Sequence, residues 1–148
     1  MGDLKLTSSA FSHGSEIPRK YGYKNGNREP PLTMNGVPEG TKSLALIMDD
    51  PDAMGAVGKV WVHWVMWNID PTNTELFVEN LTREGMTDFG EVGYGGPAPP
   101  DKRHTYVFKL YALDSELDLP DKSTKADVEK AMEGHIIEQT QLTGTYAP

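Results

Sequence analysis

Three runs of apolar and β-branched residues stand out along the chain, and loops rather than helical patterns separate them. The runs are Ser43–Met48, Val60–Ile69 and Tyr106–Leu113. Val60–Ile69 carries bulky side chains at both odd and even positions, as expected of a strand that is buried on both faces. Because no ten-residue amphipathic pattern lies between the runs, a parallel βαβ arrangement is not expected. The pattern predicts a mainly β protein with antiparallel strands.

Turn-forming residues divide the rest of the chain into short segments. The sequence has 11 prolines and 15 glycines, and such dense punctuation favours short strands over long helices. We expect Ser12–Gly40 to form loops and short edge strands, and Leu142–Tyr146 to return to the sheet. No repeat, low-complexity tract or linker is present, so residues 1–148 are expected to form a single domain.

One helix is predicted near the C-terminus. Thr124 can cap it, with Asp127 three residues later completing a capping box. The apolar positions that follow have helical spacing: Val128, Ala131, Met132, His135 and Ile136. On this interpretation Gly134 lies inside the helix and weakens it by about 1 kcal/mol relative to alanine. His135 would then be a histidine packed on the apolar face.

Charge and composition exclude several classes of protein. The net charge is −8 and the pI is about 4.9, with no basic cluster of the kind that nucleic-acid binding requires. An acidic chain is also not expected to bind anionic membranes. There are no cysteines, which removes thiolate metal sites and cysteine nucleophiles.

No targeting segment is evident, so we expect a cytoplasmic protein. The N-terminal residues are too polar for a secretory signal, and no run approaches the ~20 apolar residues of a membrane span. Met1-Gly2 opens like a myristoylation site, but Leu6 stands where serine or threonine is required. Asn80-Leu81-Thr82 is a glycosylation sequon, which has no meaning without secretion.

Two groups of polar residues lie at the first two predicted strands. Asp49-Asp50-Pro51-Asp52 directly follows the first strand. Because the three carboxylates repel one another, hydrogen bonds must stabilise at least one of them. Taken alone, Asp-Pro-Asp is typical of a turn with a purely structural role. His63 lies in the second strand, where alternation would place it on the same face as Trp61, Val65 and Trp67. It is either a packed histidine or a site residue.

A glycine- and proline-rich segment precedes the third strand. The adjacent Gly95 and Gly96 would let the backbone approach a ligand and leave N–H groups free for an anion. The prolines of residues 97–100 stiffen the loop and so reduce the entropy lost on binding. His104 and Tyr106 are two residues apart and would share a face. The combination suits a phosphate or carboxylate.

These segments together resemble the two signature regions of the phosphatidylethanolamine-binding family, and most closely its short bacterial and archaeal branch, which is Raf kinase inhibitor-like. The resemblance rests on the order and spacing of three segments: Asp50–Ala53, His63-Trp64, and Gly95–Pro100 followed by His104 and Tyr106. It extends to Leu6–Phe11, Ala131–His135 and Leu142–Tyr146, and so covers almost the whole chain.

The resemblance implies a Greek-key antiparallel β-sandwich with a few peripheral helices and a preformed pocket. The family's pocket takes phosphate and phosphorylated headgroups such as phosphoethanolamine. Carried over by motif position, the ligand-binding residues are Asp50, His63, His104 and Tyr106, with the backbone of Gly95 and Gly96. The supporting residues are Asp52, which would brace the loop, and Trp61 and Pro97 in the wall.

Two positions depart from the family pattern. Met54 stands where the family usually has proline, and it would make the pocket wall softer and more apolar. Thr105 replaces an arginine that is often found between the histidine and the tyrosine. Its loss would weaken anion binding.

The predicted function is binding of a small phosphorylated or carboxylate ligand, with no cofactor or metal. Two imidazoles with pKa values near 6.5 can donate to an anion, and Asp50 could orient one of them. The resemblance also implies docking on a protein partner such as a kinase. A homodimer stays open, since aromatic residues near the pocket could associate.

Two enzyme interpretations and one non-functional interpretation also stay open. Asp50, Asp52, His63 and His104 include the histidines and carboxylate that suit non-haem iron or zinc. A hydrolase or lyase could instead use a histidine as general base, although no nucleophile motif is present. The non-functional interpretation is a stable sandwich whose pocket has lost its ligand.

Overall fold

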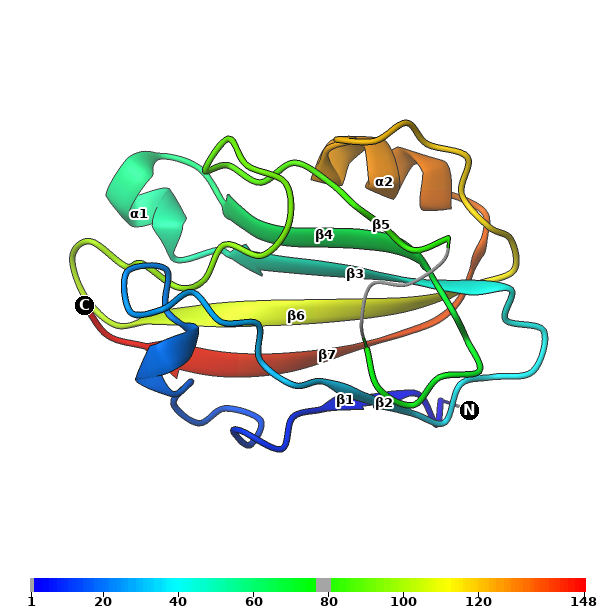
Figure 1. Cartoon of the computed structure of the whole chain (residues 1–148), viewed down its shortest axis with the longest axis horizontal. Helices are drawn as coiled ribbons and strands as arrows, with labels where there is room; N and C mark the ends of the chain where they lie inside the picture. The colour runs from blue at the N-terminus through cyan, green and yellow to red at the C-terminus, as the bar shows by residue number, and fades with distance from the viewer. Residues whose placement is uncertain (1, 77–80) are drawn as a thin grey trace.

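Seven strands in two antiparallel sheets make up most of the regular structure in the computed structural model, which describes residues 2–76 and 81–148 (Figure 1). The five-stranded sheet has the order β5-β4-β3-β6-β7, and β1 and β2 form the second sheet. The mainly β prediction is therefore confirmed. Asn80 of the sequon lies outside the described residues. The strands are β1 (Lys5–Thr7), β2 (Thr33–Asn35), β3 (Ser43–Asp50), β4 (Trp61–Ile69), β5 (Arg83–Glu84), β6 (His104–Leu113) and β7 (Ile136–Tyr146).

Three short helical segments complete the regular structure of the described chain. They are the 3₁₀ turn η1 (Arg19–Tyr21) and the α-helices α1 (Ala53–Val57) and α2 (Lys125–Met132). The three apolar runs predicted as strands correspond to β3, β4 and β6, and the predicted final extended segment is the end of β7. The sequence pattern did not predict β1, β5 or α1, because elements of two to five residues carry too few positions to show a period. No helix in the described part of the chain is long and apolar enough to cross a membrane.

The central strand β3 supplies side chains to two separate cores. All eight of its residues are buried. Leu44, Leu46 and Met48 belong to one hydrophobic cluster, while Ala45 and Ile47 belong to the other. Since alternate residues of a strand point to opposite faces, both faces of the five-stranded sheet are covered. The apolar run in the sequence is a consequence of this position.

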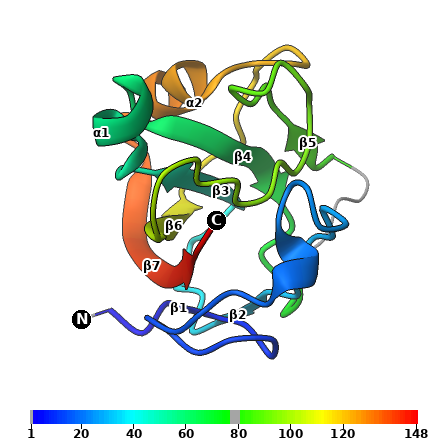
Figure 2. The ribbon, with the colours of Figure 1, turned by 90° about the vertical axis from the view of Figure 1, so that its left-hand side faces the viewer.

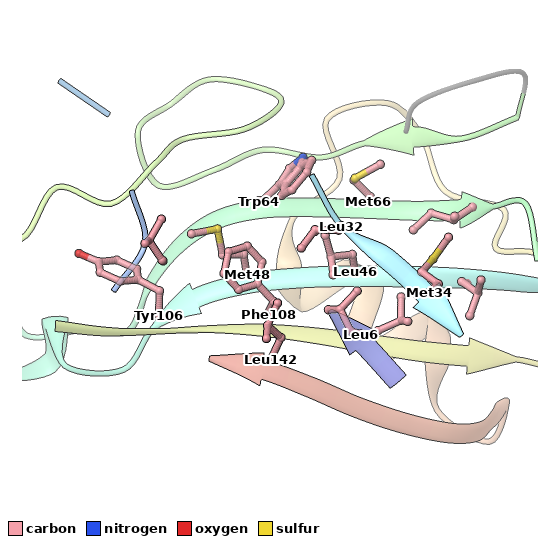
Figure 3. Packing of buried hydrophobic residues seen from close by; sticks show 14 of the residues in the cluster. Leu6, Leu32, Met34, Leu46, Met48, Trp64, Met66, Tyr106, Phe108 and Leu142 are labelled. Carbon is pink, nitrogen blue, oxygen red and sulfur yellow. The ribbon is translucent and has the colours of Figure 1, made fainter. Parts of the chain in front are cut away.

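The larger core lies between the five-stranded sheet and the N-terminal segments (Figure 3). Leu6 of β1 and Met34 of β2 share this cluster with Leu46, Trp64 and Phe108 of the large sheet. Burying a side chain of this kind contributes roughly 1.5–3 kcal/mol, so the cluster holds the two sheets together. The smaller core lies under α2 on the other face of the sheet, through Val128 and Met132. Figure 2 shows α2 on the side of the large sheet opposite β1 and β2.

The predicted C-terminal helix exists but is shorter than its apolar pattern. The capping box is present, with Thr124 Oγ1 accepting from Asp127 N at 3.3 Å and an Asp127 oxygen accepting from Thr124 N at 3.0 Å. The helix ends at Met132, and Gly134 follows with φ of +80°. A left-handed glycine just past the last turn is a common helix stop. The prediction that His135 packs on the helix is therefore wrong, because this residue is exposed.

Candidate functional site

A cavity of about 220 Å³ opens at the end of the large sheet where β3 ends and β4 and β6 begin. In Figure 1 this is the end that carries α1. Asp50 and His63 are the only titratable side chains among the described residues that line it. The remaining lining is apolar or aromatic: Ala53, Ala56, Val57, Trp61, Phe89, Ala98 and Pro100. The cavity is thus an apolar pocket with a small polar floor.

A β-bulge turns His63 into this cavity. Met48 pairs with Trp64, but the next residue of β3, Asp49, pairs with Val62, so His63 is the extra residue on β4. A bulge breaks the strict alternation of side chains. The imidazole contacts the ring of Tyr106 at 5.1 Å between centroids, on the face of the larger core. The expectation that His63 shares a face with Val65 and Trp67 is therefore wrong, because those two residues lie in the smaller core.

His63 is held as a neutral imidazole. Its Nδ1 lies 2.7 Å from the carbonyl oxygen of Gly95, which can only accept, so Nδ1 carries the proton. Burial lowers the pKa of His63 below its ordinary value and outweighs the opposite effect of the bond to Gly95. Nε2 then bears a lone pair and has no hydrogen-bond partner among the described residues. It is the ring atom left for a ligand.

His104 is held in the opposite state, as an imidazolium between two carboxylates. Nδ1 lies 2.6 Å from Asp50 Oδ2, and Nε2 lies 2.7 Å from Asp101 Oδ1. Burial by itself would lower the pKa of His104, but the hydrogen bonds to the two carboxylates outweigh it and raise this pKa. The His104 side chain is fully buried and does not line the cavity. Its link to the cavity is the hydrogen bond to Asp50, which does line it.

Two buried oxygens beside these histidines have no hydrogen-bond partner among the described residues. They are Asp50 Oδ1 and the hydroxyl oxygen of Tyr106. Burial, together with the negative charge of Asp50, raises the pKa of Tyr106 well above its ordinary value, so the hydroxyl keeps its proton. Figure 3 shows this hydroxyl pointing away from the rest of the core. Buried polar groups are normally paired. Of these two residues, Asp50 lines the cavity and Tyr106 does not, so the prediction that Tyr106 faces the ligand is not supported by the cavity lining.

The glycine loop has a different role from the one predicted. Gly95 N donates to the carbonyl of His63 at 2.8 Å, and Gly96 N donates to Asn27 Oδ1 at 2.7 Å. Neither amide is free for an anion, so the predicted glycine nest is wrong. A Cβ on Gly95 would overlap the Phe89 ring, and one on Gly96 would overlap the carbonyl of Tyr21. Glycine is needed here for close packing of the protein on itself.

The predicted supporting residues divide into two groups. Trp61 lines the cavity, and Asp52 accepts a hydrogen bond from Thr105 N at 2.8 Å, which ties the start of α1 to the start of β6. Met54 is 55% exposed and does not line the cavity, so the expected softening of the wall is wrong. Pro97 is buried, and its carbonyl accepts from Tyr23 N at 2.9 Å outside the cavity.

Phe89 is the main residue of the cavity that the sequence did not reveal. Its ring stacks on Tyr23 with centroids 4.1 Å apart and meets Trp61 and His63 edge-on at 5.6 and 5.4 Å. It therefore forms one wall and fixes the plane of His63. The only signal in the sequence is that a single aromatic residue stands in a polar, glycine-rich segment.

The metal-site interpretation finds no support in the geometry. Across residues 2–76 and 81–148, no three histidine, aspartate or glutamate side chains are grouped so that they could hold a metal ion. Both nitrogens of His104 are already bonded to carboxylates, and Asp52 faces Thr105. The residues present do not form the two-histidine, one-carboxylate set that iron or zinc would need.

Comparison with known proteins identifies the family. The family model described as phosphatidylethanolamine-binding protein matches residues 7–147. A UPF0098 protein of Methanothermobacter thermautotrophicus is 45% identical, and the alignment covers 97% of this chain and 98% of the relative. The crystal structure of a phosphatidylethanolamine-binding protein homologue from Chlamydia trachomatis superposes with a TM-score of 0.91 at 39% identity, over 99% of this chain and 98% of that one. Escherichia coli YbcL gives 0.90 at 32% identity, over 98% of each chain. The chain therefore belongs to the phosphatidylethanolamine-binding protein family.

Proposed function

We propose that the protein binds a small phosphorylated or carboxylate ligand in the 220 Å³ cavity, with His63 as the residue that contacts it. The observation that carries this proposal is the unpartnered Nε2 of His63 in the cavity wall. Asp50 lines the same cavity, and its Oδ1 has no hydrogen-bond partner among the described residues. Pockets for drug-sized molecules are roughly 300–1,000 Å³, so the size favours a phosphate-sized group.

Ligand binding is coupled to proton uptake. Neutral His63 offers a lone pair at Nε2, and it can donate to an anion only after it takes up a proton. No lysine or arginine is among the described residues that line the cavity, so this proton is the main source of positive charge for the ligand. If one proton binds with each anion, affinity falls by up to about tenfold for each pH unit above the pKa of His63.

The same polar floor favours a phosphate monoanion over acetate. A phosphate monoanion has a hydroxyl that can donate to the Asp50 carboxylate and further oxygens that can accept from protonated His63. Acetate ion has no donor, so its charge would face an unpaired carboxylate oxygen. We therefore expect phosphate and phosphoethanolamine to bind more tightly than acetate.

A histidine-resolved NMR titration with phosphate, phosphoethanolamine and acetate, below and above neutral pH, tests the proposal. We expect saturable shifts of His63, stronger at the lower pH, and loss of the response in His63→Ala. His135→Gln is a matched control, because this histidine is exposed and pairs with Asp114 outside the cavity. If His63 is silent with all three ligands, or if His135→Gln abolishes binding equally, the proposal is wrong.

A further inference from the structure

A second cavity lies on the other side of the proline segment. Its volume is about 300 Å³, and its lining includes Arg19, Lys24, Asn25, Tyr146 and the segment 97–100. Ala98 and Pro100 line both cavities, whereas His63 and Asp50 belong only to the first. Figures 1 and 2 show the chain segments that form it, around η1, before β6 and after β7, meeting at one end of the molecule. The proposed function makes no use of this space.

The charge of this cavity is opposite to that of the protein. The chain has a net charge of −8, yet residues 19–28 hold four cations and no carboxylate: Arg19, Lys20, Lys24 and Arg28. None of the four forms an ion pair with a carboxylate in the described chain, although five other lysines and arginines do. No aspartate or glutamate is among the described residues that line the cavity. Arg19 and Lys24 therefore face no acidic side chain of the described chain in this cavity, although Pro148, the last residue of the sequence, also lines it.

The Arg19 guanidinium is held in position before any ligand binds. It stacks on the Tyr146 ring at 4.2 Å, and Nη1 donates to the carbonyl of Ala147 at 2.7 Å. The buried Tyr146 hydroxyl in turn donates to the carbonyl of Arg19 at 2.8 Å and accepts from Asn25 Nδ2 at 2.7 Å. A fixed guanidinium loses less entropy when it forms paired hydrogen bonds. The remaining N–H groups of Arg19 stay available.

We propose that this second cavity is a separate anion site, which takes the phosphate or carboxylate group of a small ligand between Arg19 and Lys24. Arginine presents a planar fork that matches these oxyanions, and lysine adds a mobile point charge. Because both side chains are exposed to solvent, we expect inorganic phosphate to bind weakly. Binding weakens as salt screens the two cations.

One titration with inorganic phosphate at constant ionic strength tests this site and the first cavity separately. The Arg19 Nε–H and the Asn25 side-chain amide report on the second cavity, while the His63 ring reports on the first. We expect saturable shifts of Arg19 and Asn25 that persist in His63→Ala. A response of His63 without Asn25 overturns the second site alone, and a response of Asn25 without His63 overturns the proposed function alone.

Three variants decide whether the named cations are responsible. Arg19→Gln is expected to weaken the Asn25 response by about tenfold, the loss of one strong charged contact. Since Arg19 also packs on Tyr146, Lys24→Gln provides an independent test, because Lys24 is exposed and forms no ion pair in the described chain. Arg103→Gln is the control, since this half-exposed arginine pairs with Glu16 outside the lining. An unchanged affinity in Lys24→Gln, or an equal loss in Arg103→Gln, overturns the proposal.

Discussion

The buried carboxylate of Asp49 provides a sharp test of the energetics at the end of β3. Asp49 is completely buried, and its Oδ2 accepts from Lys109 Nζ at 3.1 Å and from Lys125 Nζ at 2.8 Å. Its Oδ1 has no partner among the described residues. Lys125 is the first residue of α2, so this triad ties the helix to the sheet. We expect the two lysines to be partly redundant.

The expected loss of stability depends on how many cations each substitution leaves beside Asp49. Lys109→Met or Lys125→Met alone leaves Asp49 with one cation, and we expect each to cost about 1 kcal/mol. The double variant leaves a buried carboxylate without any cation, for which the cost is about 3–5 kcal/mol. The loss in the double variant should therefore exceed the sum of the single losses by about 1–3 kcal/mol.

Urea unfolding of the wild type, both single variants and the double variant measures this coupling. Asp49→Asn in the double background is the matched control, because it keeps the shape and removes the charge, and we expect it to restore much of the lost stability. Additive losses, within about 0.5 kcal/mol, would refute the reasoning. So would a failure of Asp49→Asn to restore stability.

Four further variants have expected outcomes. Gly134→Ala should lower the unfolding free energy by about 1 kcal/mol in urea denaturation, because alanine is strained at positive φ. If Gly134 were instead inside the helix, alanine would raise the unfolding free energy, and that result would contradict the prediction. Tyr106→Phe should leave the unfolding free energy unchanged or raise it by up to about 1 kcal/mol, since it removes a buried hydroxyl without a hydrogen-bond partner among the described residues. A large loss of stability would show that the hydroxyl forms a hydrogen bond and would contradict the prediction. The pKa of His104 is raised on folding, so its contribution to stability is complete below about pH 6.5 and is lost as pH rises through the folded pKa. The pKa of His63 is lowered, so its contribution is complete above about pH 6.5 and is lost as pH falls. Unfolding across roughly pH 5–9 should show the alkaline slope disappear in His104→Gln and the acid slope diminish in His63→Gln.

Patterns among neighbouring residues were sufficient to predict the main strands and the start of the C-terminal helix. The apolar run of β3, the bulky residues of β4 and the capping box at Thr124 each depend on neighbouring positions, and each prediction is confirmed. The end of α2 was predicted wrongly because the apolar pattern continues past Gly134. A glycine that stops a helix and one that weakens it look alike until the backbone angle is known.

The site was harder to predict because its geometry depends on distant partners. The face of His63 is set by the pairing of Asp49 with Val62, which shifts the register by one residue. The amides of the glycine loop are taken by His63 and by Asn27, which is 69 residues from Gly96. Neither partner is visible in the pattern around the motif, so the motif indicated where the site lies and gave the wrong account of its donors.

The opposite protonation of the two histidines determines which of them can respond to a ligand. Asp101 occupies Nε2 of His104 from outside and Asp50 occupies Nδ1 from inside, so the imidazolium is neutralised and both of its donors are used. A ligand anion would find no free donor on His104 unless it displaced the Asp101 carboxylate, which is 44% exposed. Around His104 the two carboxylates and one imidazolium sum to −1, and an anion bound nearby would make this −2. Proton uptake at His63 is the change that offsets the added charge, which is why we expect ligand binding and protonation of His63 to occur together.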